Sequence, residues 1–149
     1  MTKNDNLRKR VGSLGFPLFS VEGEKNVNLT LAQVVESRDL RLWEGLPVML
    51  VNAAERGLFE YERAVSYLNK APGRHYLESL LALSLALYKV SNLEFSWAKE
   101  LYEKLTLKGK KEFKVFVERL KKEDKLKVRG YTMSSQRLKA TFNLWLDIV

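Results

Sequence analysis

One stretch of the chain, Leu77–Val90, constrains the fold more than any other. Leucine or alanine fills eight of its fourteen positions, and no β-branched residue precedes Val90. Leucine and alanine are strong helix formers because they lose little side-chain freedom in a helix. A helix that is apolar on nearly all sides must be covered by neighbours, and small residues such as Ser79 and Ala82 let them approach closely. The stretch therefore predicts the central helix of a small bundle.

The overall composition agrees with a bundle. The chain has 149 residues, of which 46% are hydrophobic and 30% charged, as in a folded globular domain. We expect an all-α fold, an irregular single-domain helical bundle of about six to eight helices over residues 1–149. The central apolar run is shorter than the roughly 20 residues that a membrane span needs, so no membrane partner is expected. The absence of cysteine and of an apolar leader favours a cytoplasmic location.

Capping residues predict the first helix boundaries. We expect a short helix over Asn4–Leu14 and an ordered loop over Phe16–Asn28. Thr30 is expected to open the next helix, because its spacing from Gln33 is that of a capping box. Asp39 is a suitable cap for the helix after that.

The run Leu46–Val51 is ambiguous, because a short apolar run fits a buried strand as well as a helix. Pro47 suits the first turn of a helix, where its missing N–H costs nothing. The segment then continues to Gly57, a helix stop signal. We favour a helix, since the sequence offers no second strand of similar quality to pair with it.

The second half of the chain predicts three further boundaries. Asn92 is expected to cap the helix that follows the central one, and Gly109 is expected to break the chain before a lysine-rich helix over Lys110–Lys125. The segment Leu126–Thr132 predicts either a short hairpin or a loop. Ser134 or Ser135 is expected to cap a last helix.

Positive charge is concentrated near the end of the chain. Residues 1–98 contain 12 basic and 11 acidic residues, whereas residues 99–149 contain 14 basic and 7 acidic residues. The total net charge of +8 therefore comes almost entirely from the last third. Such an asymmetry suggests a polyanionic partner, and the alternative is that surface lysines keep the protein soluble.

The lysine-rich helix separates its charges by side. At about 100° per residue, six lysines share about a third of its circumference, next to an apolar stripe, with Glu118 as the only acid among them. The six are Lys110, Lys111, Lys114, Lys121, Lys122 and Lys125. Clustered lysines neutralise phosphates with little regard for sequence, so this side predicts binding to DNA or RNA. A merely solubilising helix would not need its acids kept apart.

Further basic residues extend this candidate site to Lys127, Arg129, Arg137 and Lys139. Hydroxyl and amide groups lie beside Arg137 at the expected N-terminus of the last helix. Groups of these kinds at a helix N-terminus are suited to contact phosphates. A helix-turn-helix from Lys110 onward is weakly suggested, but the connection between its helices is longer than in that motif. A winged variant would need the segment Leu126–Thr132 to be a hairpin.

The sequence gives little support for catalysis. The single histidine, His75, lacks the cysteines or clustered carboxylates of a zinc site and the partners of a catalytic triad. No phosphate-binding loop and no dinucleotide fingerprint is present. We expect no enzyme activity, no cofactor and no metal, and we identify no family motif.

Two functions from different classes remain. The first is a nucleic-acid-binding module, such as a regulator or an accessory subunit of a nucleoprotein complex. The second is a protein-interaction module, an adaptor or an antitoxin-like protein, whose basic side meets an acidic protein. The last helix adds a possible homodimer interface, because Leu144 and Ile148 lie off its apolar stripe.

Overall fold

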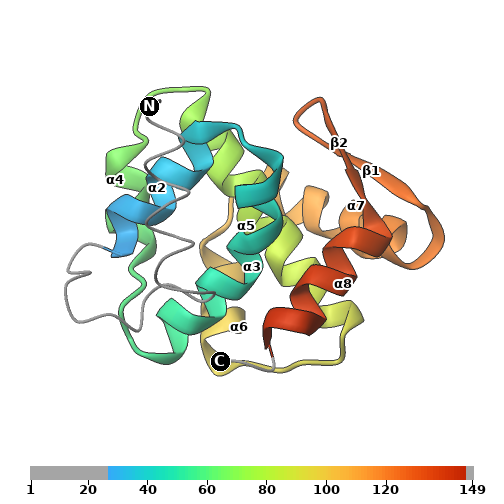
Figure 1. Ribbon diagram of the computed structural model, residues 1–149. Helices are drawn as coiled ribbons and strands as arrows, with labels where there is room; N and C mark the ends of the chain where they lie inside the picture. The colour runs from blue at the N-terminus through green and yellow to red at the C-terminus, as the bar shows by residue number, and fades with distance from the viewer. Residues whose placement is uncertain (1–26, 147–149) are drawn as a thin grey trace.

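The computed structural model describes residues 27–146, which form seven helices and one two-stranded sheet (Figure 1). The predicted all-α bundle of six to eight helices is confirmed. The helix expected over Asn4–Leu14 and most of the loop expected over Phe16–Asn28 lie outside the described residues. The elements are α2 (Val27–Ser37), α3 (Leu40–Glu55), α4 (Tyr61–Tyr67), α5 (Gly73–Val90), α6 (Ser96–Lys104), α7 (Leu107–Lys122), β1 (Lys125–Val128), β2 (Tyr131–Ser134) and α8 (Ser135–Leu146).

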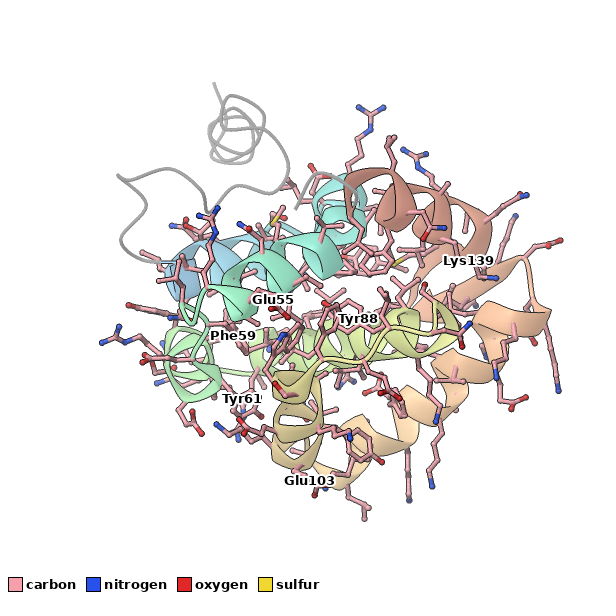
Figure 2. The ribbon with its side chains drawn as sticks, turned by 90° about the horizontal axis from the view of Figure 1, so that it is seen from below. Glu55, Phe59, Tyr61, Tyr88, Glu103 and Lys139 are labelled. Atoms are coloured by element: carbon pink, nitrogen blue, oxygen red, sulfur yellow. The ribbon has the colours of Figure 1, made fainter. Side chains whose placement is uncertain are left out.

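Helix α5 is the centre of the bundle, as the leucine-rich stretch predicts. Every residue from Leu77 to Tyr88 is buried, and α5 contacts α2, α3, α6 and α7. Ser79 and Ala82 are fully enclosed, so their small side chains lie where neighbouring helices approach. At its far end the Tyr88 hydroxyl donates to the Pro47 carbonyl of α3 over 2.6 Å. Figure 2 shows Tyr88 in the middle of the molecule.

Helix α3 resolves the ambiguity of the apolar run at Leu46–Val51, which is helical as favoured. The position expected for Pro47 is wrong, because Pro47 lies in the interior of one continuous helix rather than in a first turn. A proline there removes a helical hydrogen bond. The helix persists because Leu46, Val48 and the residues around them are fully buried, and their burial offsets the missing bond.

The ends of α3 follow the predicted capping signals. The Asp39 carboxylate accepts the N–H of Arg41 at 3.0 Å, so Asp39 is the N-cap. At the other end Gly57 has φ +70°, and the N–H groups of Gly57 and Leu58 donate to the carbonyls at positions 54 and 53. This pair of bonds is a Schellman motif, which requires a left-handed residue that glycine supplies without strain.

The capping box expected at Thr30 is wrong. Helix α2 is already formed at Val27, and Thr30 lies inside it as a buried residue. Asn28, in the first turn of this helix, has a buried side chain that is bonded to the chain after α3. Its amide donates to the Leu58 carbonyl at 3.3 Å, and its oxygen accepts the Glu60 N–H at 2.8 Å.

Asn92 caps a different helix from the one expected. It has φ +58°, and its N–H donates to the Lys89 carbonyl, while that of Leu93 donates to the Tyr88 carbonyl. Asn92 therefore terminates α5 as the left-handed residue of a second Schellman motif. Helix α6 begins later, at Ser96.

Gly109 does not break the chain but lies inside α7, which begins at Leu107. The N-cap is Thr106, whose hydroxyl accepts the Gly109 N–H at 3.1 Å. A Cβ atom at Gly109 would lie 2.7 Å from Oε1 of Glu78 on α5. Glycine is needed at this position because α7 approaches a buried carboxylate closely.

The segment after α7 is a hairpin, one of the two alternatives that the sequence left open. Strands β1 and β2 pair antiparallel, with Lys125 opposite Ser134 and Val128 opposite Tyr131. The two turn residues, Arg129 and Gly130, both have positive φ, as in a type I′ turn. The inward side chains Leu126, Val128 and Met133 are buried, so the hairpin is fixed to the core on one face.

Helix α8 closes the bundle mainly against α3, with a ring contact to α5 through Phe142 and Tyr88 at 5.4 Å. The hairpin lies on the side of the molecule away from α4 (Figure 1). Within residues 27–146, no helix is both long and apolar enough to cross a membrane.

Candidate nucleic-acid interface

Helix α7 presents an apolar side to the core and a basic side to solvent. Phe116 and Leu120 are buried at 3% and 1% exposure. The opposite side and the outward face of β1 carry exposed lysines, six of them between positions 111 and 127. We call this set the basic surface: Lys111, Lys114, Lys121, Lys122, Lys125 and Lys127.

The hairpin continues the basic surface because successive side chains of a strand point to opposite faces. Leu126 and Val128 point into the core, so Lys125 and Lys127 point outward. Thr132 lies opposite Lys127 and is also exposed. Lysines and hydroxyls on one hairpin face are typical phosphate donors.

Lys110, which the sequence placed in the same group, differs from the basic surface because it is held by partners on another helix. It is half-buried, with Nζ 3.9 Å from Oε2 of Glu103 and 5.5 Å from the ring centroid of Tyr102. Both partners belong to α6. Lys110 therefore joins α6 to α7 through a charge pair and a cation–π contact.

Arg129 also makes an internal contact. Its Nε donates to the hydroxyl of Ser79 at 3.0 Å, and that hydroxyl donates to Oε2 of Glu112 at 2.8 Å. Arg129 thus connects the hairpin turn to α5 and α7. A guanidinium held in this way fixes the position of the hairpin rather than adding to its outer face.

The two basic residues of α8 differ from the exposed lysines of the basic surface, because one is paired and the other is half-buried. Arg137 Nε lies 2.9 Å from Oε2 of Glu44 on α3. The Arg137 N–H donates to the Ser134 hydroxyl at 3.2 Å, which confirms Ser134 as a capping residue. Ser135 is buried, so neither serine hydroxyl is freely offered at this end. Lys139 is half-buried, and Figure 2 shows it at the outer edge of α8.

The helix pair with a short turn is α6–α7, not α7–α8 as the sequence weakly suggested. The hairpin separates α7 from α8, whereas only Leu105 and Thr106 connect α6 to α7. Figure 2 shows the end of α6 near Glu103, where the chain turns into α7. The interpretation of Gly109 as a break hid this pair. The available signal was Thr106, a capping residue directly before the lysine-rich helix.

A buried carboxylate holds the α6–α7 corner in place. Glu78 is 4% exposed, and its Oε1 accepts the N–H of Thr106 at 2.9 Å and the Thr106 hydroxyl at 2.7 Å. Its Oε2 accepts the Tyr61 hydroxyl of α4 at 2.7 Å. Burial, together with this hydrogen bond, raises the pKa of Tyr61 well above its ordinary value.

A groove of ≈ 1220 Å³ lies beside the basic surface, between the end of α5, α6 and α7. Lys114 and Lys121 of the basic surface form part of its wall, together with Lys89 and Lys99. Three carboxylates, those of Glu94, Glu100 and Glu103, and four aromatic residues, Tyr88, Phe95, Tyr102 and Phe113, also line it. Its walls therefore carry both signs of charge.

The candidate catalytic and metal-binding residues do not form a catalytic site within residues 27–146. His75 is exposed in the first turn of α5. No group of three or more histidine, cysteine or acidic residues in this part of the chain could hold a metal ion.

The interface predicted on the last helix is only partly within the described residues. Leu144 is 64% exposed on α8, whereas Ile148 lies outside them. Leu138 and Phe142 of the same helix are fully buried.

Comparison with protein families, with curated proteins and with solved structures finds no match to this chain. The function must therefore be inferred from its surface chemistry.

Proposed function

We propose that this protein is a nucleic-acid-binding module that holds phosphates with the basic surface of α7 and β1. One observation carries the proposal. Six exposed lysines follow one another from Lys111 to Lys127, and among the described residues only Lys122 has a carboxylate within 4 Å, that of Glu118 at 3.1 Å. Solvated ammonium groups without internal partners are free to replace the counterions of a phosphate backbone.

The rigidity of the surface supports the same proposal. The apolar side of α7 is buried against α5, and the inner face of the hairpin is buried in the core. The lysine stems are therefore anchored on elements that do not have to order on binding. We expect the module to act in the cytoplasm as a regulator or accessory subunit, without a cofactor, metal or catalytic step of its own.

Direct binding tests this proposal. Fluorescence anisotropy with labelled duplex DNA, single-stranded DNA and RNA of about 30 nucleotides is measured at about 50 mM salt, where phosphate binding is strong. Saturable binding to at least one of the three is expected. If none of them binds, the nucleic-acid proposal is wrong.

A second candidate function is a protein-interaction module of the adaptor or antitoxin-like kind. The groove beside the basic surface favours it, because its lining combines apolar residues with four lysines against three glutamates, which suits a peptide with apolar and acidic side chains. Calorimetric titration with a glutamate-rich peptide tests this alternative. Binding that is lost in Lys89→Glu, a groove residue outside the basic surface, is the expected result, and an absence of heat contradicts it.

A further inference from the structure

The outermost ridge of α7 contains two apolar side chains that are exposed and not packed in the core. Leu107 is 71% exposed and Val115 is 46% exposed, and the exposed Lys111 lies between them on the same ridge. These residues are spaced four apart, so they lie one above another along the helix. Exposed apolar groups among lysines suit a ligand that is anionic but also offers apolar contacts.

The elements on either side of α7 leave this ridge uncovered. The α6–α7 corner precedes it, and the hairpin follows it with Lys125, Lys127 and Thr132 facing outward. At 1.5 Å per residue, the 16 residues of α7 extend over about 24 Å. A helix with a free outer side fits the major groove of B-DNA, which is about 12 Å wide.

The neighbouring groove is a poorer site for a nucleic acid strand. Stacking of bases would need open aromatic faces, but Lys89 lies 5.7 Å from the ring centroid of Phe113 and Lys110 lies 5.5 Å from that of Tyr102. Glu94, Glu100 and Glu103 on its walls would repel phosphates. The charges therefore favour the convex ridge over the groove.

We propose that the ligand of this surface is duplex DNA, with α7 in the major groove and the hairpin against the adjacent backbone. This inference rests on the proposed function. Leu107 and Val115 contact thymine methyl groups, and Lys111 donates to guanine O6 or N7. Lys125 and Lys127 hold the phosphates beside the groove, with Thr132 as a hydroxyl donor.

The one carboxylate on the outer side of α7 is compatible with this arrangement. Glu118 lies 3.1 Å from Lys122, so the pair is locally neutral. A glutamate on a helix in the major groove can also accept from cytosine N4. The ridge thus offers apolar, cationic and acceptor groups, which together discriminate base edges.

Selection from a pool of duplexes with about 20 random base pairs, at about 150 mM salt, tests the inference. We expect enrichment of a short motif, with its guanine N7 atoms protected from dimethyl sulfate by the wild-type protein. Leu107→Ala/Val115→Ala should lower the affinity ratio between the enriched duplex and the starting pool about fivefold, since the truncations remove most of the apolar area that contacts the thymine methyl groups. Leu58→Ala, which truncates a leucine that is 41% exposed between α3 and α4, outside the proposed DNA-binding ridge, should leave the ratio unchanged.

The outcomes separate this inference from the proposed function. Duplex binding without enrichment and without N7 protection overturns the major-groove placement while phosphate binding stands. Tighter binding to single-stranded DNA or RNA than to duplex DNA also overturns the major-groove placement. Absence of binding to every nucleic acid overturns both.

Discussion

Glu78 shows how a single buried residue positions the candidate interface. It lies on the central helix, and within the described part of the chain it has hydrogen-bond donors on α4 and at the α6–α7 corner but no cation within 4 Å. A buried carboxylate is tolerated when such donors satisfy its oxygens. Its position determines where α7 begins and therefore where the basic surface lies.

The contact between Glu78 and Gly109 reverses an ordinary expectation. Replacing a glycine inside a helix with alanine usually stabilises a protein by about 0.5–1 kcal/mol. Gly109→Ala should instead destabilise this one by about 1–3 kcal/mol, because the new Cβ would lie 2.7 Å from Glu78 Oε1 and the carboxylate is held by three hydrogen bonds. Urea unfolding measures the difference. A stabilised variant would show that Glu78 can move freely.

The raised pKa of Tyr61 makes stability depend on alkaline pH. The fold favours the protonated phenol, so its contribution is fully present below the unfolded pKa of about 10 and is lost as pH rises further. The free energy of unfolding should therefore decrease above pH 10. Tyr61→Phe should decrease less steeply than wild type over the same range, as measured by denaturation at successive pH values. Parallel curves would contradict the assigned role of burial and of the bond to Glu78.

At the scale of elements, the hairpin depends on a contact far from its strands. Arg129→Ala removes the bond from the turn to Ser79 on α5, so the amides of β1 and β2 should exchange with deuterium faster and the melting temperature should drop. Lys127→Ala, on the exposed face of the same hairpin, is the matched control and should change neither. Unchanged exchange in Arg129→Ala would mean that the buried strand residues alone hold the hairpin.

An element could be predicted from the sequence where the residues that determine it are neighbours in sequence. The central helix and the sides of α7 could be predicted because hydrophobic periodicity depends on neighbours in sequence. Gly109 was misinterpreted because its cause, the close approach to Glu78, is a tertiary contact. Asn92 was assigned to the wrong helix, since capping residues fit either neighbour until packing decides. Lys110 and Arg129 were included in the site because a helical wheel does not reveal their partners on other elements.

At the scale of the whole molecule, Leu144 tests whether the protein forms a dimer. It is 64% exposed on α8, away from the buried Phe142 side of that helix. If α8 forms a homodimer interface, light scattering of wild type should give twice the monomer mass, and Leu144→Glu should give the monomer mass without loss of helicity. A wild-type monomer would exclude the interface.

The proposal of a local nucleic-acid-binding site depends on how charge is distributed over the whole molecule. The basic surface runs along α7 to β1, and its hairpin end lies across the molecule from α4 (Figure 1). Arg63 on α4 and Lys70 after it are exposed and lie outside the basic surface. Lys89 is unsuitable as a control despite lying before the basic third, because it lines the groove beside Lys114 and Lys121.

The most direct test is the salt dependence of binding in two matched triple variants. Lys114→Glu/Lys121→Glu/Lys125→Glu reverses three exposed lysines of the basic surface, and Arg56→Glu/Arg63→Glu/Lys70→Glu reverses three exposed residues elsewhere. Both change the net charge equally. The first variant should bind nucleic acid much more weakly, with a slope of log affinity against log salt that is smaller by about 0.7–0.9 for each lost phosphate contact, at unchanged helicity. The second should retain the wild-type slope. Equal losses in the two variants would contradict a local site and leave only general attraction by the +8 charge.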